Sequence, residues 1–106
     1  MRELIYRKAS NRDLKDIADY IGNSSGDFDA GLAFVELIRA QCAKLAASPV
    51  VLGRPTEELA PGLRGYLFKS HIIFFRCTDT RLEIVNILHE RRDLASTLYQ
   101  DGDLLQ

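Results

Sequence analysis

Residues 71–77, His-Ile-Ile-Phe-Phe-Arg-Cys, are the stretch that decides the fold. The four residues Ile72–Phe75 are all apolar, so a strand built from them is apolar on both faces. Such a strand has to lie in the middle of a sheet, where both of its faces are covered. Residues 63–68 and 82–88 also have strand composition, and a turn at Thr78-Asp79-Thr80 precedes the second of them. We therefore expect three consecutive strands in a mostly antiparallel sheet.

Two helices are predicted before these strands. A capping-box pattern at Ser10-Asn11-Arg12-Asp13 opens the first helix. Asp13 and Asp16 lie in its first turns, where the positive end of the helix dipole stabilises negative charge. Its apolar stripe is Leu14, Ile17, Ala18 and Ile21, and Gly-Asn-Ser-Ser-Gly at 22–26 ends it. The second helix begins near Asp27 or Asp29 and ends at Ser48-Pro49, because the residue before proline resists the helical region. Its predicted inner face consists of Phe34, Leu37, Ile38, Gln41 and Leu45, with Ala30, Ala33 and Cys42 alongside.

A first strand over residues 3–7 completes the predicted order, strand-helix-helix-strand-strand-strand. The weak helical pattern of 93–99 predicts a short C-terminal helix, and we expect a frayed tail at 100–106. Strict alternation in the last strand would place Leu82, Ile84, Asn86 and Leu88 on one face and Glu83, Val85 and Ile87 on the other. We therefore expect one α+β domain over residues 1–106, a two-layer sandwich with an antiparallel helix hairpin packed on the sheet.

Length and composition exclude several classes of protein. A chain of 106 residues has room for one core and one surface site. It contains no apolar run long enough for a membrane span, no Gly-rich phosphate loop and no CxxC pair. Cys42 and Cys77 are interpreted as small buried hydrophobes in a reducing compartment. We expect a cytoplasmic protein without a cofactor, a metal or a membrane partner.

The net charge of −1 hides an asymmetry along the chain. Residues 61–92 carry six basic and three acidic side chains, whereas residues 93–106 carry no basic and three acidic ones. This basic strand region is a candidate target surface, formed by Arg64, Lys69, Arg76, His89, Arg91 and Arg92. The alternative is that these cations pair with Glu83, Glu90 and Asp93 and only solubilise the surface.

No constellation in the sequence establishes catalysis. Metal-independent RNA cleavage needs a base, an acid and cations around the phosphate. The residues with the right chemistry are Arg64, Lys69, His89, Arg91 and Tyr99. Nothing in the sequence brings these groups to one phosphate, and a histidine at a strand end commonly has a structural role. Both interpretations of His89 therefore stay open.

The second predicted helix carries more apolar surface than one stripe. Phe28, Leu32 and Val35 repeat at i, i+4 and i+7 beside the main face, and Tyr20 lies off the stripe of the first helix. These four residues form a candidate docking face for a partner. The alternative is that the first helix covers them.

Several motifs in a fixed order resemble the ParE toxins of the RelE/ParE superfamily, from type II toxin–antitoxin systems. The matching segments span residues 4–95 and are Ala9-Ser10, Asp13-Leu14-x-x-Ile17-x-x-Tyr20-Ile21, Leu45-Ala46-Ala47-Ser48-Pro49, Gly53-Arg54-Pro55, Leu59-x-Pro61-Gly62-Leu63-Arg64, Ile72-Ile73-Phe74-Phe75-Arg76 and Ile87-Leu88-His89-Glu90-Arg91-Arg92-Asp93-Leu94. The chain departs from the pattern at Phe75, where tyrosine is common, and at Ser70-His71, which replaces a glycine and an aromatic residue.

This resemblance implies a binding protein that stalls DNA gyrase and is held inactive by a ParD-like antitoxin lying over the helix hairpin and a sheet edge. RelE-type relatives share the fold and cut mRNA in the ribosome with a dense basic cluster. Residues 63–77 offer only Arg64, Lys69 and Arg76, so we favour gyrase inhibition over mRNA cleavage. We also expect no sequence-specific nucleic-acid binding by the chain alone. A third hypothesis is an inactive antitoxin-binding module.

Overall fold

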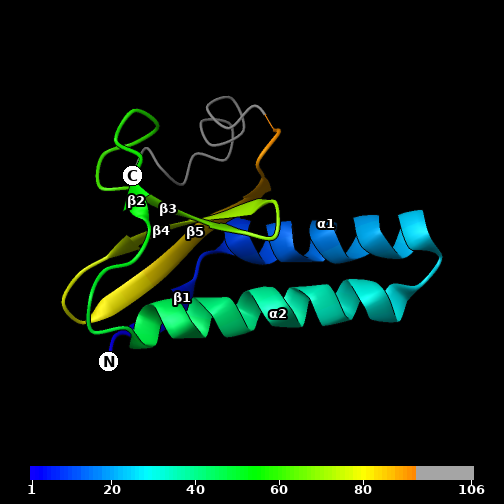
Figure 1. Ribbon diagram of the computed structural model, residues 1–106, viewed down its shortest axis with the longest axis horizontal. Coiled ribbons are helices and arrows are strands. Elements are labelled where there is room, and N and C mark those ends of the chain that lie inside the picture. The colour runs from blue at the N-terminus through cyan, green and yellow to red at the C-terminus, as the bar shows by residue number, and fades with distance from the viewer. Residues whose placement is uncertain (93–106) are drawn as a thin grey trace.

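The computed structural model describes residues 1–92, which form one sheet and one helix hairpin (Figure 1). The elements are β1 (Glu3–Tyr6), α1 (Lys8–Ser25), α2 (Phe28–Ala47), β2 (Arg54–Pro55), β3 (Arg64–Phe68), β4 (His71–Cys77) and β5 (Arg81–His89). This order confirms the predicted α+β fold and adds the two-residue strand β2. The helix predicted over 93–99 and the tail at 100–106 lie outside the described residues.

The sheet has the strand order β1-β5-β4-β3-β2, with β1 parallel to β5 and all other pairs antiparallel. Strand β4 lies in the middle, as its apolar composition predicts. Its residues Ile73, Phe74 and Phe75 are each at most 1% exposed, because the sheet is covered on both faces.

Different parts of the chain cover the two faces of the sheet. On one face the helix hairpin packs on Ile73, Phe75 and Ile84 to form the main core. On the other face Phe74, Val85 and Leu88 pack against Ala60 and Leu63 of the loop that joins β2 to β3. This loop is therefore part of the core.

The start of α1 differs from the prediction. The helix begins at Lys8, and the backbone carbonyl of Arg7 accepts from the Asn11 amide, so Ser10 lies inside the first turn. The Ser10 hydroxyl donates to that same carbonyl at 2.7 Å. Asp13 is buried and does not serve the helix dipole: its Oδ2 accepts from Asn86 Nδ2 and from the Ile87 amide, each at 2.9 Å. Asp13 thus ties α1 to β5.

The end of α1 and the bounds of α2 agree with the prediction. Gly26 ends α1 in the left-handed region at φ 73°, and Asp27 caps α2 by accepting from the Ala30 amide at 3.2 Å. The buried face of α2 is rotated about the helix axis by about one residue from the predicted inner face. Leu37 is 49% exposed, whereas the buried positions are Gly31, Val35, Ile38, Cys42, Leu45 and Ala46. Because α2 is apolar around much of its circumference, periodicity alone does not determine its rotation.

The alternation predicted for the last strand holds to Val85 and is wrong for Ile87 and Leu88. A β-bulge places Phe75 opposite Ile84 and Phe74 opposite Asn86, which leaves Val85 as the extra residue. Ile87 therefore packs in the helix-side core with Ile84, while Val85 and Leu88 pack on the opposite face.

The far half of the helix hairpin projects beyond the edge of the sheet, as Figure 1 shows. Only the near half of each helix has strands beneath it, so the projecting half packs mainly helix on helix. Gly31 makes this contact possible, because a Cβ there would overlap the backbone carbonyl of Ala18. Within residues 1–92, no helix has the length and apolar content needed to cross a membrane.

Candidate functional site

The structure divides the six predicted target residues between two ends of the strands. Arg64 and Arg76 lie near the loops that flank β2, whereas Lys69 and His89 lie at the other end, where the β3–β4 turn meets the end of β5. Arg91 and Arg92 follow directly after β5. The residues therefore do not form one continuous patch.

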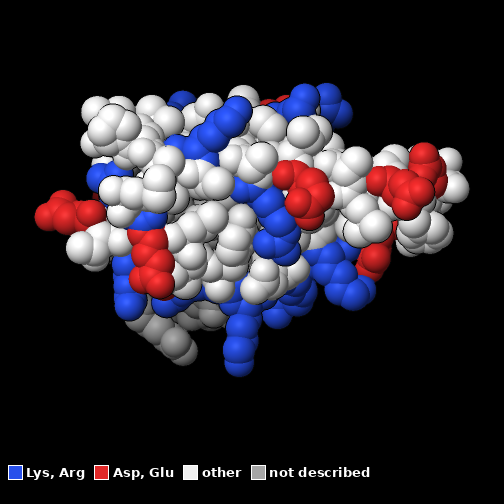
Figure 2. Space-filling model, turned by 90° about the horizontal axis from the view of Figure 1, so that it is seen from below, with Lys and Arg blue, Asp and Glu red and all other residues white. Residues whose placement is uncertain are grey.

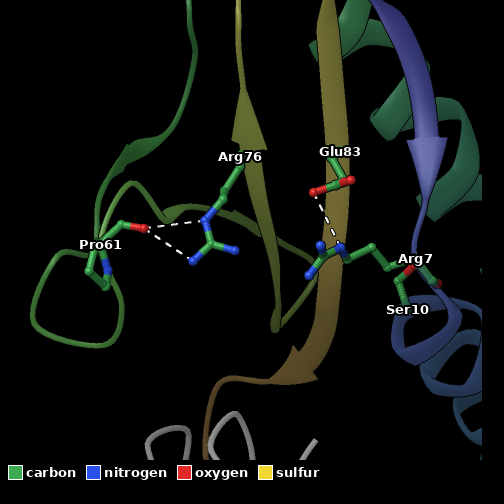
Figure 3. Close-up of polar contacts among 5 residues, drawn as sticks. All are labelled: Arg7, Ser10, Pro61, Arg76 and Glu83. Atoms are coloured by element: carbon green, nitrogen blue, oxygen red, sulfur yellow. Dashed lines mark hydrogen bonds and ion pairs between the residues drawn. The ribbon is translucent and has the colours of Figure 1, made fainter. Parts of the chain in front are cut away.

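Arg64 and Arg76 hold loops in place. Arg64 donates from Nη2 to the Gly53 carbonyl at 2.9 Å, and Arg76 donates from Nε and Nη2 to the Pro61 carbonyl at 3.2 and 3.1 Å (Figure 3). Glu83 was one expected partner of the basic strand region. It forms an ion pair with Arg7 instead, with Arg7 Nε 3.3 Å from Glu83 Oε1 (Figure 3). The guanidinium groups of Arg64 and Arg76 are thus committed in part to the protein's own backbone.

The β3–β4 turn is built from residues that do not favour its geometry. Lys69 and Ser70 have φ of 48° and 66°, the left-handed values of a two-residue hairpin turn that usually contains asparagine and glycine. The Ser70 carbonyl accepts from the Glu90 amide at 2.9 Å, which joins the turn to the end of β5. The turn therefore brings Lys69 close to the segment that carries His89 and the two arginines.

A cavity of about 660 Å³ lies between α1 and this end of the sheet. Ile17, Ile21 and Ile87 provide apolar lining. The polar lining consists of Asp13, Asp16, Tyr20, His71, His89 and Arg92. We call this site the His71–His89 cavity, because the two imidazoles face each other across β4 and β5 with ring centroids 5.2 Å apart.

The hydrogen bonds of the two histidines indicate different neutral tautomers. His71 Nδ1 lies 3.0 Å from the Lys69 carbonyl, so it carries the proton and leaves Nε2 as an acceptor. His89 Nδ1 accepts from the Arg91 amide at 3.1 Å, so its Nε2 carries the proton. The pair thus offers one acceptor and one donor.

Sequence reasoning singled out His89 and Arg92 but missed His71 and Asp16 as members of a site. In a hairpin without a bulge, the pairing of Cys77 with Leu82 would place His71 opposite Leu88. The extra residue at Val85 shifts the pairing by one and places His71 opposite His89. No local pattern in the sequence signals this shift.

Three of the four predicted partner-docking residues are exposed on the projecting part of the hairpin. Tyr20 is 73% exposed, and Phe28 and Leu32 are each 60% exposed. Leu37, predicted to be internal, joins them at the surface. Val35 is only 8% exposed and packs in the main core, so we leave it out of the docking surface. The position of Phe28 depends on Gly22, because a Cβ there would overlap its ring.

The side of the molecule on which α2 lies has mixed charge. Figure 2 shows acidic and basic side chains scattered among uncharged ones on this side, without a field of one sign. We call the exposed large apolar residues of the two helices, Tyr20, Phe28, Leu32 and Leu37, the hairpin surface.

Cys42 and Tyr6 lie together in the interior, whereas Cys77, also expected to be buried, is only partly buried. Burial raises the pKa of the Cys42 thiol to about 11, and burial together with the neighbouring Cys42 raises the pKa of Tyr6. The Arg39 guanidinium lies 5.0 Å from the centre of the Tyr6 ring. With their pKa values raised, Cys42 and Tyr6 are protonated near neutral pH and have the character of packing residues.

Comparison with known proteins gives a family. The family described as "ParE toxin of type II toxin-antitoxin system, parDE" matches residues 4–94. A solved chain of the chromosomal ParDE system from P. aeruginosa superposes with a TM-score of 0.74 at 25% identity, covering 84% of this chain and 96% of that chain. A search of curated protein sequences gave no match. With the family match extending over most of its length, this chain belongs to the ParE toxins of type II toxin–antitoxin systems.

Proposed function

We propose that this toxin acts in the cytoplasm by inhibiting DNA gyrase, and so DNA replication, and that a ParD-like antitoxin neutralises it by docking on the hairpin surface. The observation that carries the antitoxin part is the hairpin surface itself. Phe28 and Leu32 are four residues apart on α2, so they share one exposed apolar face of the hairpin, while Tyr20 and Leu37 are exposed elsewhere on it. Large apolar side chains exposed on a small domain are typical of a protein–protein interface.

The placement of the cations supports gyrase inhibition over mRNA cleavage. A nuclease site needs several cations converging on one phosphate, yet Arg64 and Arg76 each donate to a loop carbonyl away from Lys69 and His89. Lys69 and Arg91 lie on an exposed turn and an exposed segment, where they suit contacts with a protein or with DNA phosphates. We assign these two residues to the target surface.

A paired assay tests the target. The purified toxin is added to gyrase with supercoiled DNA and, separately, to translating ribosomes with mRNA. We expect cleaved gyrase–DNA complexes and intact mRNA. Cut mRNA with unaffected gyrase would refute the proposed target and favour the ribosome-dependent endoribonuclease. No effect in either assay, from a toxin that binds its antitoxin, would favour an inactive antitoxin-binding module.

A matched pair of variants tests the hairpin surface. Leu32→Glu removes a large apolar contact and introduces a charge, which costs about 2–3 kcal/mol at an interface and weakens antitoxin binding roughly 30- to 150-fold. Leu67→Glu is the control, because Leu67 is equally exposed at 61% but lies on β3. Both variants should retain the wild-type circular dichroism spectrum. Equal affinity of the two variants would show that the antitoxin docks elsewhere.

A further inference from the structure

The outer face of α2 is apolar, whereas the solvent face of a surface helix is normally polar. Alanine recurs on it every seven residues, at Ala33, Ala40 and Ala47, and Leu37 lies between the first two. Lys44 completes the spacing, and all five residues are exposed, Leu37 to 49%. Positions three and four residues apart form one seam along a helix, as in a coiled coil. We call these five residues the α2 seam.

The α2 seam faces away from the rest of the molecule. Ile38 and Cys42 mark the buried side of α2, which packs in the main core, and the seam lies on the opposite side of the helix. In Figure 1, α2 runs along one edge of the molecule. Phe28 and Leu32 lie about 80–120° around the helix from Ala40, so they form a separate face. That face stays available to the antitoxin.

Two charged side chains lie at equal distances from the middle of the seam. Glu36 comes four residues before Ala40 and Lys44 four residues after it, and both are exposed. Ion pairs along a helix join residues three or four apart, so Glu36 and Lys44 do not pair with each other. Among residues 1–92, neither takes part in any ion pair. The seam thus suits a partner that brings a cation to Glu36 and an anion to Lys44.

A second copy of α2 meets this requirement when it runs antiparallel. With a two-fold axis at Ala40, Glu36 of each copy comes to the level of Lys44 of the other, so the charge pair forms twice. The small side chain of Ala40 lets the helix axes approach to about 8 Å. A parallel pair would instead set Glu36 against Glu36 and Lys44 against Lys44. Figure 2 shows no field of one sign on this side, so the two identical surfaces do not repel each other as a whole.

We propose that this toxin associates with a second copy of itself through the α2 seam, as a two-fold symmetric, antiparallel helix pair. The inference goes beyond the proposed function, because it involves neither the antitoxin nor gyrase. The seam spans about four turns. Just beyond its end, Val50 and Val51 add apolar side chains that are 62% and 40% exposed. An interface of this kind belongs to the small class that buries less than about 1,200 Å², so we expect a weak dimer.

Sedimentation equilibrium of the purified full-length toxin tests the association. We expect a dissociation constant of about 10–100 µM, so the average mass should rise from the monomer towards the dimer between about 5 and 500 µM. The monomer mass is 12.0 kDa. A monomeric mass over this whole range would overturn the inference and leave the proposed function untouched.

A charge swap tests the antiparallel register. Glu36→Lys sets lysine against Lys44 of the other copy, and Lys44→Glu sets glutamate against Glu36. Because each contact occurs twice, either variant should weaken the dimer about five- to thirtyfold. The double variant Glu36→Lys, Lys44→Glu exchanges the signs and should return to within about threefold of the wild-type dissociation constant. A double variant as weak as the single ones would refute the pairing of Glu36 with Lys44.

A charge at the centre of the seam tests its location. Ala40→Glu sets two carboxylates against each other at the two-fold axis and should weaken the dimer more than about thirtyfold. Asn11→Glu is the matched control, because it adds the same charge at an exposed position of α1 and should change the dissociation constant less than about twofold. All these variants should keep the wild-type circular dichroism spectrum.

Two further outcomes would assign the seam differently. A dimer that Ala40→Glu leaves intact would show that the copies meet at another surface. A monomeric wild type whose antitoxin affinity falls with Ala40→Glu would show that the antitoxin, and not a second copy, covers the seam.

Discussion

Replacing Asp13 with alanine tests how α1 is held on the sheet. Asp13 is 7% exposed, and its Oδ2 accepts from the Asn86 side chain and from the Ile87 amide. Both donors are buried, since Asn86 is 0% and Ile87 1% exposed. Alanine removes the carboxylate oxygen, so the Asn86 side-chain amide and the Ile87 backbone amide both lose this acceptor.

The magnitude follows from these two contacts. Each buried donor that loses its acceptor costs about 1–3 kcal/mol, so the pair costs about 2–6 kcal/mol. Asp13 also lines the His71–His89 cavity, which lets water reach the vacated position and favours the lower part of that range. We therefore expect the free energy of unfolding to fall by about 3 kcal/mol, and the Tm by about 12 °C for a domain of this size.

Urea and thermal unfolding followed by circular dichroism measure this loss. Asp16→Ala is the control on the next turn of α1, where an exposed carboxylate should change stability by less than about 0.5 kcal/mol. Asp13→Asn keeps one acceptor oxygen and should cost about 1 kcal/mol. A loss for Asp13→Ala no larger than for Asp16→Ala would refute the role given to this contact.

Three further predictions concern the turn, the helix contact and the buried thiol. Ser70→Gly should stabilise the fold by about 0.5–1 kcal/mol, because glycine adopts the turn's φ of 66° without strain; a lower midpoint in urea would contradict this. Gly31→Ala should destabilise it by about 1–3 kcal/mol, because the added Cβ meets the fixed backbone of Ala18; unchanged thermal unfolding would show that the helices separate without cost. Cys42 should resist alkylation at pH 8, since a pKa raised to about 11 leaves roughly one thiolate in a thousand. The same raised pKa predicts a stability contribution that is complete below pH 9 and is lost as the pH rises through 11, which alkaline unfolding of wild type and Cys42→Ala would compare.

The two surfaces differ in how well the sequence revealed them. Phe28 and Leu32 were predicted as docking residues because α2 is more apolar than one stripe requires, and both lie exposed on the projecting hairpin. Val35 belongs to the same sequence pattern but is buried, because the helix is rotated by about one residue from the predicted phase. A single helix that is apolar around much of its surface leaves this rotation to its neighbours.

The basic strand region shows the corresponding limit for charge. Counting residues correctly found an excess of cations between 61 and 92. It did not reveal that Arg64 and Arg76 donate to carbonyls at Gly53 and Pro61, contacts that join segments 11 and 15 residues apart. Such contacts depend on where loops cross the strands, and composition carries no information about that.

The sequence by itself determined the elements and the central place of β4. An apolar run such as Ile72–Phe75 has to be covered on both faces, and Gly26 and Pro49 end helices through their own backbone preferences. Tertiary structure alone decided the parallel pairing of β1 with β5, the rotation of α2 and the bulge at Val85. That bulge places His71 opposite His89 and so builds the cavity. Local patterns fix what a segment forms, whereas the register between segments comes from the packing of the whole core.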